Sequence, residues 1–201
     1  MPRGKIRNAE EVRGEILEAA RALMIEGGVR AVRLREILAR SGASNGQLYG
    51  IFANTDEIIL GVNTETLGRL EHRLKSVDAS DSLECLVALA RCYLGFASDE
   101  TPLWRALFEF VPADGGATAE SLQADQARLF ELAAGPLSEL FPDLGEAEVL
   151  LRARTLFSAV HGIVSISLES RYAGVTIERL EDELAGLVRA ALVGFRTVSP
   201  H

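Results

Sequence analysis

The chain has 201 residues, of which 48% are hydrophobic and 25% are charged, a composition typical of a folded globular protein. Its formal net charge of −8 excludes a protein whose whole surface is basic. The longest uncharged apolar run, residues 155–168, is shorter than the roughly 20 residues that a bilayer requires. The N-terminus lacks the apolar segment of a secretion signal. We therefore expect a cytoplasmic protein.

Apolar residues recur at three- and four-residue spacing along the chain, and no alternating run typical of a strand interrupts them. This pattern predicts an all-α protein of about nine helices. The first helix begins behind Asn8, which forms a capping pair with Glu11, and it ends at Gly27–Gly28. A short second helix follows in the segment LREILARSG, Ser44 caps a third, and Asn54 caps a longer fourth helix.

The rest of the chain forms a second helical body in this prediction. Its helices are expected near residues 81–98, 102–112, 118–140, 145–172 and 176–197, with breaks rich in Gly, Pro, Asp and Ser between them. We therefore divide the chain into an N-terminal helix-turn-helix domain, residues 1–55, and a helical domain, residues 56–201.

The cysteines and histidines give no sign of a metal site, a disulfide or an enzyme. Cys85 and Cys92 lie seven residues apart in a predicted helix, so their backbones are separated by about 10 Å, beyond disulfide reach. We interpret them as core-facing thiols, and the alternative of a redox sensor has no support in the neighbouring residues. The three histidines, His72, His161 and His201, are far apart. No catalytic triad, phosphate loop or cofactor motif is visible, so we expect no cofactor, no metal and no enzymatic activity.

The segment SGASNGQLYGIF, residues 41–52, carries the functional prediction. A helix, a turn with Gly42 and a second short helix form the pattern of a helix-turn-helix, whose second helix enters the major groove with its N-terminal residues first. Amide side chains there suit base edges, because Asn and Gln can pair with adenine through two hydrogen bonds. A tyrosine hydroxyl suits a phosphate. The outward residues predicted to meet DNA are Ser44, Asn45, Gly46, Gln47, Tyr49 and Gly50.

The charge distribution agrees with this location. Residues 1–60 hold nine Lys/Arg and eight Asp/Glu, whereas the remainder holds 12 and 21. Only the N-terminal part can approach a polyanion without a large repulsion. Its candidate phosphate contacts are Arg33 and Arg35, together with an N-terminal arm that carries Arg3, Lys5 and Arg7. An ordinary solvated face is the alternative interpretation of these arginines.

At these residues the chain resembles the TetR/AcrR family of bacterial transcription regulators. The match runs from EILEAARALMIEGG through LREILARSGASNGQLYGIF to ANTDEIILGV, about a quarter of the chain. Farther on, LFSAVHGIVSISLESRYAG is similar to a ligand-domain subtype that has a His-Gly pair in its penultimate helix. Val32, Asn45 and Thr55 depart from the family pattern, where a hydroxyl residue, a lysine and a phosphate-gripping lysine are usual.

The resemblance implies a repressor that binds a palindromic operator as a homodimer through helices 145–172 and 176–197. It also implies an unknown small-molecule inducer that releases the DNA, and Thr55 as a DNA contact. We expect the inducer site among apolar and aromatic positions of the second body. The candidate residues are Tyr93, Phe96, Trp104, Phe108, Phe130, Phe157, His161 and Ser165. Each of these side chains has an alternative role in the core.

One alternative function stays open. Because Val32, Asn45 and Thr55 each lack a donor or a positive charge that the family pattern supplies, the chain could be a helical ligand sensor or partner-binding protein with a weakened DNA-binding head.

Overall fold

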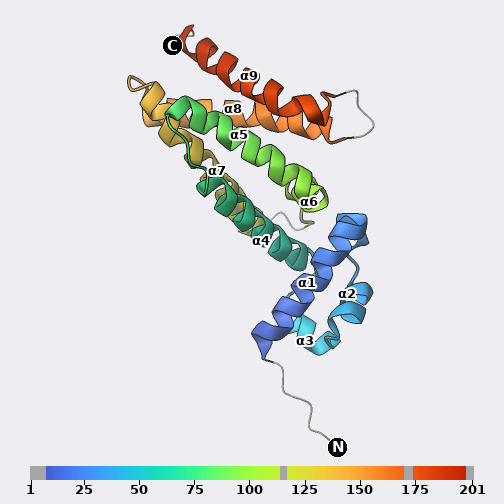
Figure 1. The fold of residues 1–201 in the computed structure, drawn as a ribbon. Coiled ribbons are helices and arrows are strands. Elements are labelled where there is room, and N and C mark those ends of the chain that lie inside the picture. Colours follow the sequence, from blue (N-terminus) through green and yellow to red (C-terminus); the bar gives the residue numbers. More distant parts are fainter. Residues whose placement is uncertain (1–7, 114–116, 170–173, 198–201) are drawn as a thin grey trace, which may run out of the picture. The chain divides into compact units, whose positions relative to one another are not determined.

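The computed structural model describes residues 8–113, 117–169 and 174–197, without side chains for 117–123, 125 and 126. Within these residues the chain is all-α, with nine α-helices, one short 3-10 helix and no strand, which confirms the predicted fold class (Figure 1). The helices are α1 (Ala9–Gly27), α2 (Leu34–Ser41), α3 (Asn45–Tyr49), α4 (Thr55–Lys75), α5 (Ser82–Asp99), α6 (Thr101–Glu109), α7 (Ala117–Leu140), α8 (Glu146–Ser167) and α9 (Ile177–Thr197).

Backbone contacts divide the chain into two compact units. The first unit comprises Met1–Gly68 and Pro102–Gln123, and the second comprises Arg69–Thr101 and Ala124–His201. This division differs from the boundary expected at residue 55. The first part of α4 belongs with the N-terminal helices because Ile58, Ile59 and Val62 are buried in their core.

The N-terminus of α1 is capped as the sequence predicts. The Asn8 Oδ1 accepts a hydrogen bond from the backbone N–H of Glu11 at 2.7 Å, and a Glu11 carboxylate oxygen accepts from the backbone N–H of Asn8 at 3.2 Å. Two donors at the helix start are thereby satisfied. The buried face of α1 packs against α2 and α3 around Ile16, Ile37 and Leu48, each fully buried.

The turn between α2 and α3 depends on Gly42. This residue ends α2 with φ +64°, in the left-handed region that side chains with a Cβ rarely adopt. Its backbone N–H donates to the carbonyl of Leu38 at 3.0 Å. The short α3 then begins at Asn45 with its direction already set by the turn.

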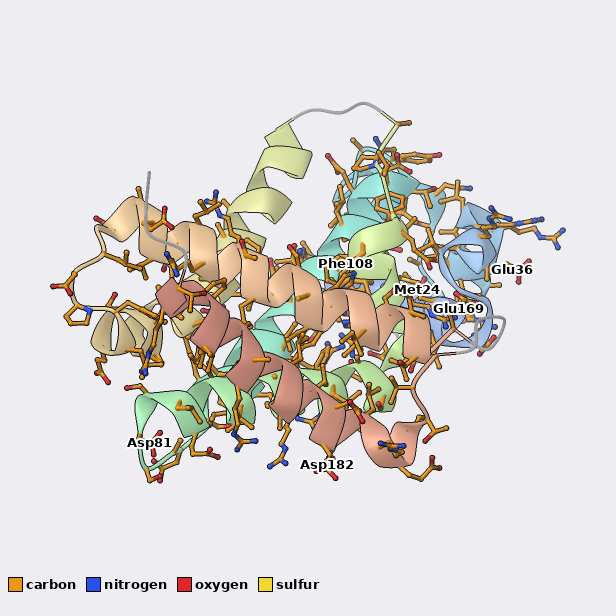
Figure 2. The ribbon with its side chains drawn as sticks, turned by 90° about the horizontal axis from the view of Figure 1, so that it is seen from above. Met24, Glu36, Asp81, Phe108, Glu169 and Asp182 are labelled. Carbon is orange, nitrogen blue, oxygen red and sulfur yellow. The ribbon has the colours of Figure 1, made fainter. Side chains whose placement is uncertain are left out.

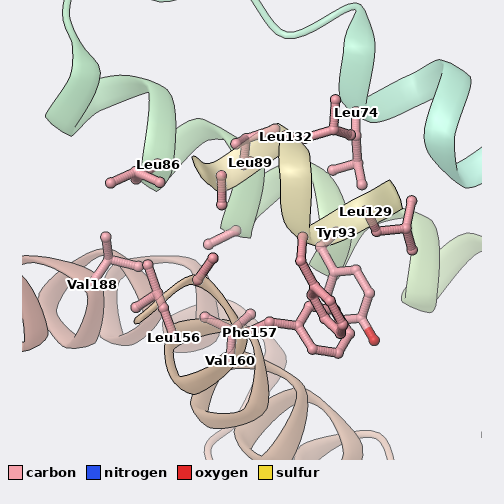
Figure 3. A pocket seen from close by; sticks show the side chains of 14 residues that line it. Leu74, Leu86, Leu89, Tyr93, Leu129, Leu132, Leu156, Phe157, Val160 and Val188 are labelled. Atoms are coloured by element: carbon pink, nitrogen blue, oxygen red, sulfur yellow. The ribbon is translucent and has the colours of Figure 1, made fainter. Parts of the chain in front are cut away.

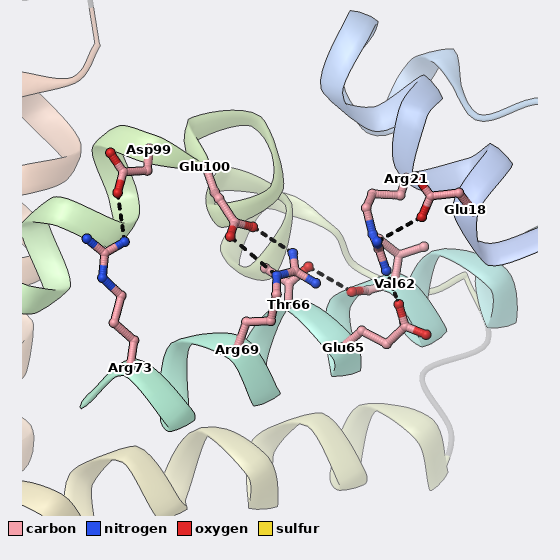
Figure 4. A network of polar contacts seen from close by, with 9 residues as sticks. All are labelled: Glu18, Arg21, Val62, Glu65, Thr66, Arg69, Arg73, Asp99 and Glu100. Atoms are coloured by element: carbon pink, nitrogen blue, oxygen red, sulfur yellow. Dashed lines mark hydrogen bonds and ion pairs between the residues drawn. The ribbon is translucent and has the colours of Figure 1, made fainter. Parts of the chain in front are cut away.

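Arginines tie α4 to its neighbours within each unit (Figure 4). In the first unit, Arg21 of α1 bonds to Glu18 at 2.8 Å and to Glu65 of α4. In the second unit, Arg69 binds Glu100 through two hydrogen bonds of 3.3 and 2.6 Å. These pairs are half-exposed, so each orients its helices more than it stabilises them.

The second unit is built on α5, α8 and α9, whose backbones pack closely against one another. Asp81 caps α5 by accepting from the backbone N–H of Glu84 at 2.9 Å, and Figure 2 labels it together with Asp182 of α9. The helix predicted at residues 176–197 is present as α9, and its apolar residues Leu180, Leu184, Val188 and Leu192 are buried.

Among the described helices, α8 alone is long and apolar enough to cross a membrane by length and composition. It ends at Ser167, short of the predicted residue 172. The core helix of a soluble protein can have the same length and composition. In α8, 33% of the most apolar 18-residue stretch is buried inside the protein.

A buried arginine, Arg152, joins α8 to the end of α9. Its side chain donates to the backbone carbonyl of Phe195 at 2.6 Å and to Glu148 at 3.2 Å. The guanidinium lies 5.5 Å from the ring centroid of Phe141 and 4.9 Å from that of Phe195. Only 5% of Arg152 is exposed, so its charge is compensated by the carboxylate, the carbonyl and the two rings.

We expect Arg152→Ala to lower the free energy of unfolding by about 2 kcal/mol or more, because the Phe195 carbonyl loses a charged donor in a buried site. Urea unfolding followed by circular dichroism measures this difference. Arg179→Ala is the control, since Arg179 forms an exposed pair with Glu183 at 3.0 Å and its loss is expected to cost less than about 0.5 kcal/mol. Equal effects of the two substitutions would contradict a structural role for Arg152.

Candidate functional site

The outer face of α3 is polar and exposed. Asn45, Gly46 and Tyr49 are exposed, with Tyr49 55% exposed to solvent, while Leu48 between them is fully buried. The helix therefore presents its first residues outward because Leu48 fixes its inner face to the core. Ser44 and Gly50, which flank the helix, are also exposed.

Gln47 has a structural role at the start of α3. Its side-chain oxygen accepts from the backbone N–H of Ser44 at 3.0 Å, and the Gln47 backbone N–H donates to the Ser44 hydroxyl at 3.3 Å. This reciprocal pair is a capping box. The Ser44 cap is predicted from the sequence, whereas Gln47 is predicted only as a residue that contacts DNA bases. With its oxygen engaged, Gln47 offers DNA its NH₂ donors alone, whereas pairing with adenine through two bonds needs both groups.

The two predicted arginines, Arg33 and Arg35, and the neighbouring Arg40 differ in how they could reach a phosphate. Arg33 is exposed at the N-cap of α2. The Arg35 side chain is 92% exposed and forms two hydrogen bonds of 3.3 and 3.2 Å with one oxygen of its neighbour Glu36. Arg40 instead binds Glu26 through two hydrogen bonds of 2.6 Å, and this hydrogen bonding lowers the pKa of the Glu26 carboxyl. Arg40 is thus held by a carboxylate of α1.

The positions that depart from the family pattern have identifiable environments. Val32 is buried in the core of the first unit. At the start of α4, Thr55 is half-buried and is followed by two carboxylates. Glu57 accepts from the backbone N–H of Ala53 at 2.7 Å, and Asp56 accepts from that of Ala113 at 2.9 Å. The predicted arm with Arg3, Lys5 and Arg7 lies outside the described residues.

An apolar cavity of about 60 Å³ lies within the second unit, between α4, α5, α7, α8 and α9 (Figure 3). Three of the predicted ligand residues line it: Tyr93, Phe130 and Phe157. The other residues that line it are Leu74, Leu86, Leu89, Ala90, Leu129, Leu132, Ala133, Ala153, Leu156, Val160 and Val188.

The aromatic side chains of the cavity form one cluster with His161. The Phe157 ring meets the rings of Tyr93 and Phe130 edge-on, with centroids 5.3 and 5.1 Å apart, and stacks on His161 at 5.8 Å. The Tyr93 hydroxyl is hydrogen-bonded to the Nδ1 of His161 at 2.8 Å. Burial lowers the pKa of His161 below its usual value, which favours the neutral imidazole.

Other predicted ligand residues do not line this cavity. Trp104 and Phe108 belong to the first unit, where their rings pack edge-on at 5.7 Å. Phe96 is buried elsewhere in the second unit, and Ser165 lies on α8 outside the lining. The leucines of α7 in the lining, Leu129 and Leu132, are not predicted from the sequence, because their spacing is also that of ordinary core positions.

The two cysteines lie outside both α3 and the cavity lining. Both thiols are half-buried, and burial raises their pKa values. The Cys92 thiol donates to the backbone carbonyl of Arg73 at 3.5 Å. Among the described residues, no group of three or more His, Cys, Asp or Glu side chains could hold a metal ion.

A helix-turn-helix with an exposed polar second helix, in one chain with an apolar cavity, defines a class of DNA-binding regulators that respond to a small molecule. Comparison with protein families specifies the class. Residues 16–62 match the model of bacterial regulatory proteins of the tetR family, and residues 86–195, more than half of the chain, match the tetracyclin repressor-like C-terminal domain. The chain belongs to the TetR family and is a ligand-responsive DNA-binding transcriptional regulator.

Solved structures share the fold. A protein of unknown function from Rhodococcus sp. RHA1 is 17% identical, with a TM-score of 0.74 over 96% of this chain and 98% of that one. A tetR-family transcriptional regulator from Streptomyces coelicolor is 21% identical, with a TM-score of 0.70 over 94% and 83% of the two chains. The regulator PfmR from Thermus thermophilus is 20% identical, with a TM-score of 0.60 over 89% and 97%. The sequence matches none of the curated proteins.

We expect Gln47→Ala to lower the free energy of unfolding by about 0.5–1 kcal/mol, because the backbone N–H of Ser44 loses its acceptor. Gln47→Glu should leave it unchanged or raise it, since a carboxylate keeps the acceptor and suits the positive end of the helix. Urea unfolding measures both. Asn45→Ala, on the same helix but outside the capping box, is the control, and an equal loss there would show that Gln47 has no special structural role.

Proposed function

We propose that the protein is a cytoplasmic, non-enzymatic repressor that binds a palindromic operator as a homodimer and is released by a small-molecule inducer. The observation that carries this proposal is the outer face of α3, which is exposed and polar while Leu48 beneath it is fully buried. A surface helix held this way can enter a major groove without any change in its own packing.

The contacts divide into base readout and phosphate binding. Asn45 is the exposed amide whose oxygen and nitrogen can both meet an adenine, while Gly46 lets the backbone come close to the groove and Gln47 contributes donors. Tyr49 and the two arginines, Arg33 and Arg35, are assigned to phosphates. Ser44 and Gly50 flank α3, and Thr55 is the first residue of α4. These three residues are assigned to the edge of the DNA major groove that α3 enters.

The proposed dimer forms through α8 and α9. One face of α8 exposes Leu151, Ala159 and Ile166, with Gly162 between the last two. One face of α9 exposes Gly186, Ala190 and Val193. Small residues between apolar ones allow two helices to approach closely and bury both stripes, so a second copy of the chain fits these faces. A two-fold axis would then match a palindromic site.

Release by an inducer requires a difference in affinity. The ligand must bind the conformation that does not fit the operator more tightly than the one that does, and the coupling is reciprocal, so DNA must weaken ligand binding by the same factor.

A ligand sensor with a weakened DNA-binding head is the second candidate. It is favoured by the carboxylates of Asp56 and Glu57 in the first turn of α4, which would repel a phosphate there, and by the loss of positive charge at Asn45 and Thr55.

Selection of random duplex DNA by the purified full-length protein, followed by sequencing of the bound pool, tests the proposal. A two-fold symmetric consensus is the expected result, because two α3 helices of one dimer would read equivalent half-sites. No enrichment at either low or moderate salt would favour the sensor without DNA binding.

On the selected duplex, we expect Arg33→Ala or Arg35→Ala to weaken binding and to reduce the slope of log K against log salt by about 1. Arg40→Ala is the matched control, because its guanidinium is held by Glu26, and it should leave the slope unchanged. Fluorescence anisotropy across a salt series measures all three. A normal slope for both Arg33→Ala and Arg35→Ala would remove these residues from the interface.

We expect Ala190→Arg to convert the dimer to a monomer, because a charged side chain in a closely packed interface is desolvated without a partner. Sedimentation velocity measures the change. Ser98→Arg, at an exposed position of α5, is the control and should stay dimeric. A dimeric Ala190→Arg protein would place the interface elsewhere.

A further inference from the structure

The cavity of the second unit is lined by side chains that carry no charge. Among the described residues that line it, Tyr93 alone has a polar side-chain group, and the others are Leu, Ala, Val and Phe (Figure 3). An ion transferred into such a site loses its hydration without gaining a partner, which costs several kcal/mol. The lining therefore selects against charged ligands.

The one polar corner of the cavity is neutral. The Tyr93 hydroxyl shares a hydrogen bond of 2.8 Å with the Nδ1 of His161, and Tyr93 is 3% exposed. Because burial lowers the pKa of His161, this corner offers a neutral donor and acceptor at pH 7. A ligand hydroxyl can donate to the tyrosine oxygen, and when the Nδ1 of His161 carries the proton the tyrosine hydroxyl can itself donate to a ligand carbonyl. A ligand carboxylate would meet a tyrosine and a neutral imidazole here, neither of which compensates its charge.

A charged residue that contacts the aromatic cluster lies outside the lining. The Arg154 guanidinium is 5.9 Å from the ring centroid of Phe130, and Arg154 is an exposed residue of α8. Phe130 lines the cavity and Arg154 does not, so a ligand inside the cavity contacts the ring and not the guanidinium. This arginine defines the rival ligand class, an apolar acid.

The cavity has to enlarge to hold a ligand. Its volume of about 60 Å³ is below the roughly 150 Å³ of a cavity that binds benzene. One wall is formed by Leu129, Phe130, Leu132 and Ala133 of α7, just before Gly135 and Pro136 in the same helix. Proline cannot donate the helical hydrogen bond to the carbonyl four residues earlier, so α7 bends more easily here.

We infer that this cavity takes an uncharged, hydrocarbon-rich small molecule with a single hydroxyl or carbonyl group directed at the Tyr93 hydroxyl. The inference rests on the proposed function, because it names the chemical class of that function's inducer. The polar group of the ligand is placed at the side of the cavity formed by Tyr93.

A matched pair of probes tests the class. Cyclohexylmethanol and cyclohexanecarboxylate share one carbon skeleton and differ in charge at pH 7.5. Isothermal titration calorimetry of the full-length protein without DNA is expected to show binding of the alcohol at least tenfold tighter than that of the acid. Equal or tighter binding of the acid, or no binding of the alcohol, would overturn the inference.

Variants locate the bound alcohol. Ala133→Leu fills the cavity and should weaken alcohol binding more than tenfold, whereas Ala134→Leu, the next residue of α7 and not part of the lining, should leave it unchanged. Tyr93→Phe keeps the ring and should weaken alcohol binding about three- to tenfold, the effect of one hydrogen bond. It needs no rearrangement of the core, so it tests the inference even if Ala133→Leu fails to fold. Unchanged affinity in Tyr93→Phe would contradict the assigned polar contact.

DNA release is measured separately, as the anisotropy of the selected duplex during titration with the alcohol. Alcohol binding without release supports the ligand class and contradicts the inducer role. Operator binding together with a preference for the acid overturns the ligand class and leaves the repressor proposal standing.

Discussion

The packing of Leu48 into the core of the first unit is the interaction that fixes the position of α3. A helix as short as Asn45–Tyr49 is unstable by itself, so its place and direction come from the core beneath it and from the capping box at its start. With Leu48 fully buried, helical geometry turns Gly46 and Tyr49 away from the core, and Asn45 is exposed at the first position of the helix. The same core contact that stabilises the fold therefore decides which side chains are available to a partner.

Much of this local structure could be predicted because its causes are local. Asn8 with Glu11 and Ser44 before α3 satisfy backbone groups within one helical turn, and the left-handed Gly42 requires no distant partner. The apolar stripe of α9 is likewise visible in its own sequence. Such features depend on residues three or four positions apart, which a single sequence displays directly.

The features that escaped prediction depend on residues far apart in the sequence. Nothing local indicates that Arg40 is held by Glu26, or that the leucines of α7 face a cavity while the aromatic residues of α6 belong to another unit. Gln47 is a different case, because its neighbour Ser44 gives the signal. The amide of Gln47 suits a DNA base, and this chemistry alone led to its prediction as a DNA contact. The same amide oxygen also accepts from the backbone N–H of Ser44 and completes the cap of α3.

The first unit is discontinuous in the sequence. Leu103 and Ala106 of α6 are buried in its core, and the Nδ2 of the buried Asn63 donates to the Ala106 carbonyl at 3.2 Å. A fragment that stops at residue 68 would expose this part of the core to water. The nascent chain thus cannot complete the unit until α6 has left the ribosome, and a chimaera that transplants it must carry residues 102–123 as well as 1–68.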